Sequence, residues 1–246
     1  MSRVLVIPDL HNPACHPGAL AFCRDLHEKH DCNKVVSIGD MVDHQAISFH
    51  TKNPNCPGPK DETKLTRFCL RPWHETFPEL IITLGNHDAR VLRLAESVGI
   101  TDEYLRDYNE VWETEGWTWV EDTIIDDVYY FHGEGRSGKT PAFNAMEDYL
   151  MSVVMGHCHS ASGIKWKANP MRRTFGMDTG CLIDIDAFQF AYGKHMRSRP
   201  MLSACVVIDG MPSHYIMPCG KGEKYHKSKF KRRAKSGSTT QTQTKG

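Results

Sequence analysis

The sequence lacks any long hydrophobic run. Its longest apolar stretches, such as Val4–Pro8 and Val35–Ile38, have the length of a strand, whereas a helix needs about 20 apolar residues to cross a bilayer. Asp9 and His11 interrupt the first stretch before it could form the apolar core of a secretory signal. We therefore expect a cytoplasmic protein with no membrane-spanning segment.

Paired cysteines and internal repeats are missing as well. The nine cysteines include no Cys-x-x-Cys pair and their number is odd, which argues against a disulfide framework and favours reduced thiols. No segment recurs at a fixed period, so the sequence does not predict a solenoid or a propeller. With 246 residues, 40% of them hydrophobic, the chain is large and apolar enough to bury one large core or two small ones.

The chain carries no formal net charge, but its charges are unevenly distributed. Residues 221–246 contain nine Lys and Arg and a single acid, Glu223, which gives a net charge of +8 and leaves −8 on the rest of the chain. This basic segment has no apolar periodicity, so we expect it to be disordered when free and to attract nucleic acid or another polyanion. We thus predict a globular domain over residues 1–219 and a basic tail over residues 220–246.

Within residues 1–219, short β-branched runs alternate with segments of helical periodicity, as is typical of an α/β domain. The clearest predicted strands are Arg3–Pro8, Lys34–Ile38, Leu80–Leu84, Val128–Phe131 and Ser152–Met155. Apolar residues at helical spacing predict helices over Ala19–Lys29, Arg90–Val98 and Pro141–Leu150. Glu62–Phe77 has helical character and is a candidate lid or insertion. We expect hairpin-like strand pairs over Trp117–Phe131 and over Leu202–Asp209 with His214–Met217.

A short polar motif follows each of the five predicted strands. In chain order these motifs are Asp9-Leu10-His11, Gly39-Asp40-Met41-Val42-Asp43, Gly85-Asn86-His87-Asp88, His132-Gly133 and Gly156-His157-Cys158-His159. Because the carboxyl ends of parallel strands lie along one edge of a sheet, side chains far apart in the sequence converge there. The converging side chains offer oxygen and imidazole nitrogen atoms, and they suffice for two metal ions if one carboxylate bridges the pair. Two such ions can share a hydroxide and hold the attacking and leaving oxygens at phosphorus, so the motifs predict hydrolysis of a phosphate ester.

These five motifs resemble those of the calcineurin-like metallophosphoesterase superfamily, whose pattern runs D-x-H, G-D-x-x-D, G-N-H-[DE], H and G-H-x-H in this order. All five are intact, and they span Asp9 to His159. The resemblance implies an α/β fold, a four-layer α/β/β/α sandwich of two mixed sheets, with a binuclear metal site at the carboxyl ends of the strands. The segment Gly39–Ser48 also looks like that of small phosphoesterases encoded by bacteriophages, which would locate the protein in the host cytoplasm.

The resemblance also implies a role for each motif residue. Two metal ions would have seven ligands: Asp9, His11 and His159 for one ion, Asn86, His132 and His157 for the other, and Asp40 as the bridge. His87 would protonate the departing oxygen, oriented by Asp88, and Asp43 would steady a ligand histidine. Mn²⁺ is the preferred ion, and Fe, Zn²⁺, Mg²⁺ and Ni²⁺ are also compatible with these ligands.

Two further motifs indicate other chemistry. Gly133–Thr140 matches the P-loop pattern G-x-x-x-x-G-K-[ST] between a predicted strand and a predicted helix. The next strand, however, ends in a histidine motif where an NTPase needs a Mg²⁺-coordinating Asp. We therefore favour a loop that contacts substrate phosphate through Arg136 or Lys139. Asp178-Thr179-Gly180 resembles the aspartic-protease triplet, but a lone copy lacks the partner carboxylate, and we interpret it as a turn beside the site.

The motifs define the reaction class and leave the substrate open. Specificity is expected from Pro54–Phe77, from Gly133–Thr140 and from Lys165–Arg173. In the last segment, Arg172 and Arg173 are candidate substrate contacts, because basic residues near an aromatic side chain suit a phosphate with a stacked base; a solvated surface ribbon explains the same pattern. The favoured function is a phosphodiesterase or nuclease acting on nucleotide or nucleic-acid diesters. The alternatives are a phosphatase acting on proteins or nucleotides and a metal-binding scaffold without turnover, and the sequence indicates no oligomeric state.

Overall fold

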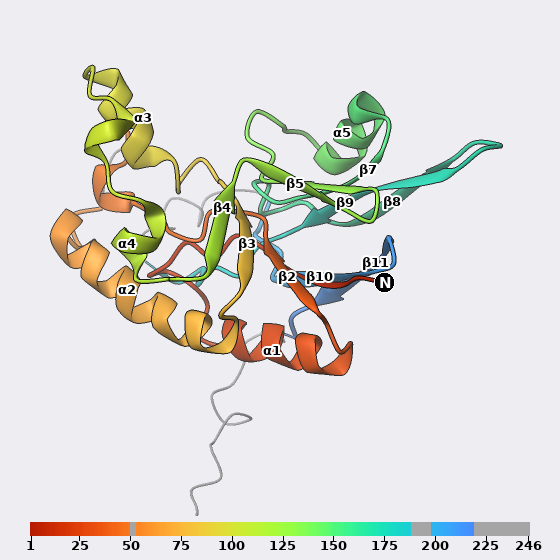
Figure 1. The fold of residues 1–246 in the computed structure, drawn as a ribbon, viewed down its shortest axis with the longest axis horizontal. Helices are drawn as coiled ribbons and strands as arrows, with labels where there is room; N and C mark the ends of the chain where they lie inside the picture. The colour runs from red at the N-terminus through yellow and green to blue at the C-terminus, as the bar shows by residue number, and fades with distance from the viewer. Residues whose placement is uncertain (50–52, 188–197, 219–246) are drawn as a thin grey trace, which may run out of the picture.

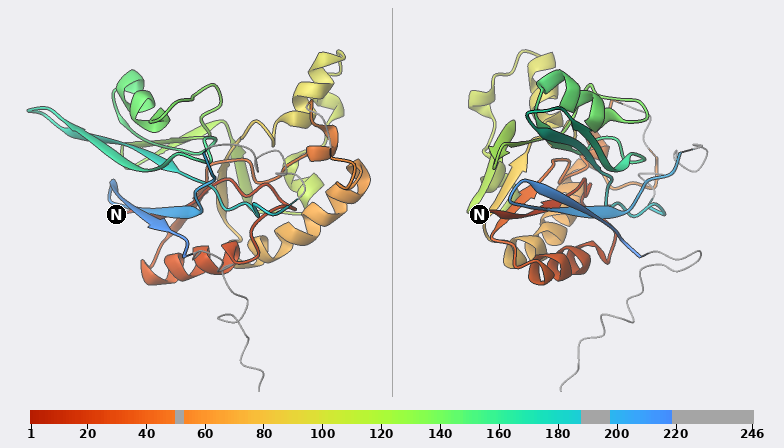
Figure 2. Two further views of the ribbon diagram at one scale, coloured as in Figure 1. Left: turned by 180° about the vertical axis from the view of Figure 1, so that it is seen from behind. Right: turned by 90° about the vertical axis from the view of Figure 1, so that its right-hand side faces the viewer.

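Two mixed β-sheets pack face to face, and helices cover the outer face of each sheet (Figure 1). The computed structural model describes residues 1–49, 53–187 and 198–218. The predicted basic tail over residues 220–246 and the domain boundary at residue 219 lie outside these described residues. The layers run helix, sheet, sheet, helix (Figure 2), which confirms the predicted α/β/β/α fold class.

The first sheet has six strands in the order β11-β10-β1-β2-β3-β4. Its strands β1 to β4 are mutually parallel, and β10 is antiparallel to both of its neighbours. The strands are β1 (Arg3–Ile7), β2 (Lys34–Ser37), β3 (Leu80–Thr83), β4 (Trp117–Val120), β10 (Ser203–Ile208) and β11 (Met211–Ile216).

The second sheet has five strands in the order β5-β6-β7-β9-β8. Strands β6, β7 and β9 are parallel, while β5 and β8 are antiparallel strands at the two edges. The strands are β5 (Asp122–Ile125), β6 (Val128–Phe131), β7 (Ser152–Met155), β8 (Ser162–Ala168) and β9 (Arg173–Thr179). Strands β1, β2, β3, β6 and β7 confirm the five strands predicted from the sequence.

The core lies on both sides of β1. Side chains alternate along a strand, so Val4 and Val6 contact the second sheet while Leu5 and Ile7 contact the helices. Both faces of this buried strand are therefore apolar, as the continuous apolar run Val4–Ile7 predicts.

Helices cover the two outer faces unequally. The outer face of the first sheet packs against α1 (Ala19–Lys29), α2 (Pro59–Thr76) and α4 (Tyr108–Trp112). The second sheet is covered by α5 (Pro141–Tyr149). Figure 1 shows α3 (Arg90–Ser97) projecting beyond the sheets after β3; two 3₁₀ helices are η1 (Gln45–Ile47) and η2 (Asp102–Tyr104). None of the helices in the described ranges has the length and apolar character of a membrane span.

The helical segment predicted over Glu62–Phe77 is α2, and it is not a lid. Its Leu70 and Trp73 side chains are 0% and 3% exposed and belong to the core. Thr66 donates a hydrogen bond of 3.3 Å to the carbonyl of Asn12, in the loop after β1. The amphipathic helix therefore packs against the core and is hydrogen-bonded to the loop after β1, at the carboxyl edge of the first sheet.

The hairpin predicted over Trp117–Phe131 is corrected by the structure. β4 pairs in parallel with β3 in the first sheet, whereas β5 and β6 form a hairpin in the second. Only Glu121 separates β4 from β5, and the tight hairpin turns need at least two residues. The chain consequently crosses from one sheet to the other at Glu121.

Two other strand pairs complete the comparison with the sequence. The hairpin of β10 and β11 is confirmed. β8 and β9 form a hairpin that the sequence pattern does not predict, because β8 buries none of its side chains and so shows no apolar alternation.

The triplet Asp178-Thr179-Gly180 is not a turn beside the site, because Asp178 and Thr179 are the last residues of β9. The Asp178 carboxylate accepts a hydrogen bond of 3.2 Å from the N–H of Ala142, in the first turn of α5. Burial raises the pKa of Asp178 to about 6. This residue therefore joins α5 to the second sheet.

Close packing of β9 against α5 gives a testable prediction. A Cβ atom added at Gly176 would lie 2.5 Å from the carbonyl carbon of Ala142 and 2.6 Å from the nitrogen of Phe143. Because these backbone atoms cannot rotate away, Gly176→Ala should lower the free energy of unfolding by about 1–3 kcal/mol. Gly58→Ala is the matched control, since a Cβ atom there meets nothing within 4 Å. Urea denaturation measures both variants, and equal unfolding midpoints would contradict the close approach of α5 to β9.

Candidate metal centre

Three of the predicted ligands adopt an unusual backbone conformation in the loops that follow β1, β2 and β7. His11, Asp40 and His157 have φ angles of 51°, 48° and 65°. This left-handed region costs a non-glycine residue of order 1–3 kcal/mol and is characteristic of functional sites. The sharp turns gather side chains from both sheets at their common carboxyl edge.

Four side chains form a first cluster: Asp9, His11, Asp40 and His159. One ligand atom from each lies within 4.8 Å of those of the other three. The Nε2 atom of His159 is 3.1 Å from Nε2 of His11 and 3.1 Å from Oδ2 of Asp9. His159 is partly exposed and the other three are buried. Two carboxylates and two imidazoles in this arrangement could hold a divalent cation.

A second cluster lies beside the first and consists of Asn86, His132 and His157. The Oδ1 atom of Asn86 is 3.0 Å from Nε2 of His132 and 3.0 Å from Nδ1 of His157. The two imidazole nitrogens are 3.2 Å apart. Asp40 connects the clusters, because its Oδ2 atom is 3.4 Å from His11 Nε2 in the first and 3.4 Å from His132 Nε2 in the second.

The hydrogen bonds around the histidines fit a metal centre. The Nδ1 atom of His11 contacts Oδ1 of Asp43 at 2.9 Å, and Nδ1 of His132 contacts the carbonyl of Ile38 at 2.8 Å. We assign the proton of each ring to Nδ1, because its partner can only accept, and this assignment leaves a lone pair on each Nε2 atom. The lone pair of His11 then faces the nearby nitrogen of His159, an arrangement that a cation between them would stabilise.

Two glycines of the motifs leave room for the carboxylates. A Cβ atom on Gly85 would overlap the Asp40 carboxylate, and one on Gly156 would overlap the Asp9 carboxylate. Glycine is therefore required at both positions by the close approach of a ligand and not by a positive φ angle.

His87 lies at the edge of the first cluster. Its Nδ1 atom is 3.0 Å from Oδ1 of Asp43 and 2.8 Å from the Asp43 carbonyl. Its ring meets the His11 ring edge-on, with the centroids 4.4 Å apart, and its backbone N–H donates to Oδ1 of Asp40 at 2.8 Å. The side chain is 23% exposed, so a molecule in solvent can reach it.

A protein-family comparison agrees with this geometry. The family model described as calcineurin-like phosphoesterase matches residues 2–181. The chain belongs to the calcineurin-like phosphoesterase family. It is therefore a phosphoesterase hydrolase, and its clustered His and Asp groups are typical of the binuclear metal centres of that family.

The solved structures found by comparison are distant in sequence. A metallophosphoesterase from Sphaerobacter thermophilus is 15% identical, with a TM-score of 0.42 over 88% of either chain. Yfce, a phosphoesterase from E. coli, is 11% identical, with a TM-score of 0.43 over 84% of this chain and 88% of its own. Nuclease MPE from Pseudomonas putida is 13% identical, with a TM-score of 0.39 over 87% of this chain and 86% of its own. A comparison with curated proteins finds no match, and nothing in these results supports the predicted bacteriophage origin.

The charges of the phosphoesterase site depend strongly on one another. Burial by itself raises the pKa of the Asp40 carboxyl. The nearby His132, His87 and His11 have the larger combined effect and hold this pKa well below its usual range. Burial also raises the pKa of Asp43, but the hydrogen bonds from His11 and His87 lower it by more, so the pKa of Asp43 is below its usual value. The pKa of His11 is lowered by burial and by His87, which favours the neutral form that binds metals. Burial lowers the pKa of His87, but the carboxylates of Asp40 and Asp43 raise it by more, so this pKa rises to about 9.

The structure does not support the role expected of Asp88. Its two carboxylate oxygens accept backbone N–H groups, Oδ1 from Val42 at 3.1 Å and Oδ2 from Gly85 at 3.0 Å. Burial and the nearby Asp40 raise the pKa of Asp88 to about 7. Asp88 thus joins the loops after β2 and β3, and the carboxylate in contact with the His87 ring is Asp43.

Two further buried residues support the site, and no sequence motif indicates them. Arg90 donates through Nη1 to the carbonyls of Asp43 at 2.8 Å and His44 at 2.9 Å. Glu62 of α2 accepts the N–H groups of Gln45 at 2.7 Å and Ala46 at 2.8 Å. Together they fix residues 43–46 beside His87. Acidic residues are common and usually exposed in the first turn of a helix, where Glu62 lies. Nothing in the sequence therefore indicates that Glu62 is buried.

The predicted substrate contacts are less closely associated with the centre. Arg136 pairs with Asp148 and lies over the Tyr149 ring, 5.2 Å from its centroid, so it is directed toward α5. Lys139 is exposed in the loop before α5. Arg172 and Arg173 lie at the turn of the β8–β9 hairpin, and β9 runs seven residues from there to the carboxyl edge, which is about 20 Å of strand. Figure 1 shows this hairpin extending away from the sheets, so we do not include these two arginines in the site.

The double contact of Asp43 with His11 and His87 gives a prediction for metal binding. Asp43→Ala removes the acceptor that orients His11, so affinity for Mn²⁺ should fall about 10–100-fold. Asp40→Ala removes the group shared by both clusters and should abolish binding of at least one ion. Calorimetric titration of metal-stripped protein measures both, with the exposed Asp25→Ala as the matched control. Unchanged Mn²⁺ affinity in Asp43→Ala would show that His11 needs no carboxylate partner.

Proposed function

We propose that this phosphoesterase is a metal-dependent phosphodiesterase or nuclease, which hydrolyses nucleotide or nucleic-acid phosphodiesters. The supporting observation is how the arginines nearest to the ligand motifs are used. Arg90 donates to backbone carbonyls, and Arg136 pairs with Asp148. A phosphate monoester is largely a dianion near neutral pH and needs an additional cation to match its second charge. With both arginines engaged and the proton of His87 assigned to the leaving group, none of these three residues adds the charge that a dianion needs, which supports the singly charged diester.

We propose two divalent ions as cofactors, with Mn²⁺ preferred. The first would be held by Asp9, His11 and His159, the second by Asn86, His132 and His157, and Asp40 would be shared by both. When bound, the ions would supply the positive charge that activates a water molecule and neutralises the phosphate oxygens. The oxygen and imidazole donors are equally suited to Fe, Zn²⁺, Mg²⁺ or Ni²⁺.

His87 acts as the general acid in this proposal, and Asp43 is its positioning residue. The Nδ1 atom of His87 is engaged by Asp43, so Nε2 is the atom that gives a proton to the departing oxygen. Holding a general acid within hydrogen-bond reach of the leaving group contributes typically 10²–10⁴-fold to the rate.

The decisive experiment compares a diester with a monoester. Metal-stripped protein is reloaded with Mn²⁺, and kcat/KM is measured for bis-p-nitrophenyl phosphate and for p-nitrophenyl phosphate. We expect the diester to be preferred. A preference for the monoester would identify a phosphatase instead, and inertness of the metal-loaded protein toward both esters would favour a scaffold without turnover.

His87→Ala serves as the control for the mechanism in the same experiment. p-Nitrophenolate leaves without a proton, so the variant should keep most of its activity on bis-p-nitrophenyl phosphate. A dinucleotide has an alkoxide leaving group, and its hydrolysis should fall by about 10²–10⁴-fold. Equal losses on both substrates, or loss of bound metal, would contradict the assignment of His87 as an acid.

We also propose that the basic segment binds nucleic acid. It carries a net charge of +8 over residues 221–246, and contacts between Lys or Arg and phosphate groups weaken steeply as salt rises. Deletion of residues 221–246 should leave turnover of bis-p-nitrophenyl phosphate unchanged, weaken binding to single-stranded DNA and flatten its salt dependence. Fluorescence anisotropy at several salt concentrations measures this effect. A parallel loss of small-ester turnover would show that the segment belongs to the catalytic domain.

A further inference from the structure

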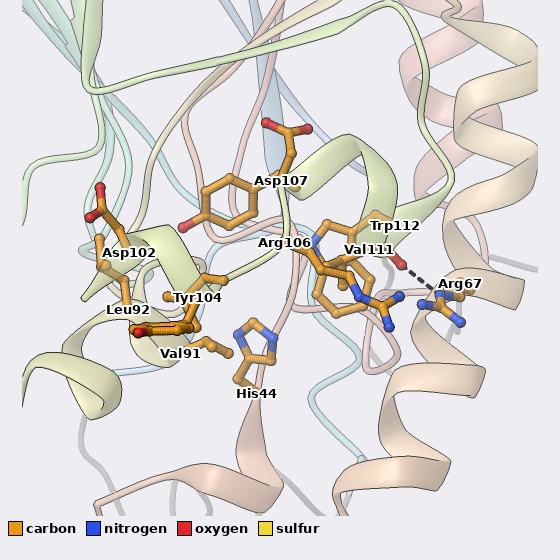
Figure 3. A pocket seen from close by; sticks show the side chains of 12 residues that line it. His44, Arg67, Val91, Leu92, Asp102, Tyr104, Arg106, Asp107, Val111 and Trp112 are labelled. Atoms are coloured by element: carbon orange, nitrogen blue, oxygen red, sulfur yellow. Dashed lines mark hydrogen bonds between the residues drawn. The ribbon is translucent and has the colours of Figure 1, made fainter. Parts of the chain in front are cut away.

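A second concave site lies next to the metal centre and is not used by the chemistry proposed above. It is a cavity of about 690 Å³ between η1, α2, α3, η2 and α4 (Figure 3). Its lining comes from segments that follow β2 and β3 and from α2, and it includes His44, Arg67, Tyr104, Arg106, Tyr108 and Trp112. Such a volume is in the range of sites that bind small organic ligands.

The cavity wall is hydrogen-bonded to the segment that carries the proposed general acid. His44 contacts the carbonyl of His87 through Nδ1 at 2.8 Å. Tyr108 donates through its hydroxyl to the carbonyl of Asp88 at 3.3 Å. The cavity therefore adjoins the backbone of the loop that carries His87.

The lining is aromatic and contains a buried donor without a partner. The rings of His44 and Trp112 lie 5.4 Å apart, and Tyr104 is 82% exposed at the opening. Trp112 is only 3% exposed, yet within the described part of the chain its indole Nε1 has no hydrogen-bond partner. Buried N–H groups are nearly always paired. Because the nitrogen itself is buried, a ligand in the cavity accepts its hydrogen bond only after a neighbouring side chain moves aside.

Charged groups lie at opposite ends of the same cavity. Figure 3 shows Asp102 at one end and the guanidinium groups of Arg67 and Arg106 at the other. A flat heteroaromatic ring with hydrogen-bond acceptors suits the aromatic middle. Both guanidinium groups already have partners, Arg67 the Val111 carbonyl at 2.6 Å and Glu113 at 3.7 Å, and Arg106 the Glu110 carboxylate at 3.6 Å. We therefore assign no phosphate to the arginine end of the cavity.

We infer that this cavity binds the nucleobase on the leaving-group side of the scissile phosphate, with the Trp112 indole N–H donating to an acceptor of the base. The inference rests on the proposed function, because it assumes that the phosphate is bound at the metal centre and that His87 marks the leaving side. Every nucleobase offers ring or carbonyl acceptors, and stacking on aromatic rings tolerates any base. The substrate class is thus a nucleoside phosphodiester of broad base tolerance.

Binding of two monophosphates to the full-length Mn²⁺-loaded protein tests this inference without depending on turnover. Adenosine 5′-monophosphate and ribose 5-phosphate carry the same phosphate, so the ratio of their Kd values, measured by calorimetry at 4 °C, reports the contribution of the base. The expected ratio favours the nucleotide by about tenfold or more, the magnitude of one stacked base.

The variants identify the place where the base binds. Tyr104→Ala, at an exposed position, and Trp112→Phe, which keeps a ring but loses the N–H, should each reduce the ratio several-fold. The matched controls Tyr149→Ala on α5 and Trp166→Phe on β8 should leave it unchanged. Thermal unfolding checks the buried Trp112 position, and Tyr104→Ala decides alone if Trp112→Phe does not fold.

The outcomes separate this inference from the proposed function. Equal Kd values for the two ligands, or a ratio that survives both cavity substitutions, would overturn the nucleobase site even if bis-p-nitrophenyl phosphate is hydrolysed. A ratio that responds to Trp166→Phe would likewise overturn it in favour of the β8–β9 hairpin. Discrimination that is lost in the cavity variants, in a protein that hydrolyses no diester, would leave the nucleobase site standing and overturn the proposed function alone.

Discussion

The buried carboxylate of Asp40 is the group on which the rest of the site depends. One of its oxygens is equidistant, at 3.4 Å, from a histidine of each cluster, and the other accepts the backbone N–H of His87. Such a position requires a left-handed backbone at Asp40, in the loop after β2, and a residue without Cβ at Gly85. A buried carboxylate is stable only where cations or donors surround it. The surrounding histidines therefore stabilise the charge of Asp40, and Asp40 in turn holds together predicted ligands contributed by two different sheets.

A second level of support fixes the segment that follows. Asp43 contacts both His11 and His87. Arg90 binds the backbone carbonyls of residues 43 and 44, and Glu62 binds the backbone N–H groups of residues 45 and 46. This segment links three parts of the molecule: the first metal cluster, the proposed general acid and the cavity next to it. Side chains held by several partners keep their geometry when substrate arrives, which is how a site achieves preorganisation.

Local patterns explain why much of the frame could be predicted. The β-branched runs at residues 3–8 and 152–155 are short, continuous and apolar on both faces, so they read as buried parallel strands, and the structure has β1 and β7 there. Patterns fail where a strand buries little, as in β8, or where one residue sends the chain to another sheet, as at Glu121. In both places the partner strand, and not the local sequence, decides the structure.

The sequence by itself determined five of the strands, the polar motifs at their ends and the family, because strand patterns and the spacing of residues within a motif are local properties of the chain. Which carboxylate serves which histidine was decided only by the tertiary structure. Asp88 is adjacent to His87 in the sequence, but its oxygens are taken by the N–H groups of Val42 and Gly85, and Asp43 from another loop contacts His87 instead. The same holds for the cavity beside His87 and for the distance of the β8–β9 turn from the metal centre. These features arise from contacts between segments far apart in the chain, and no short stretch of sequence encodes such contacts.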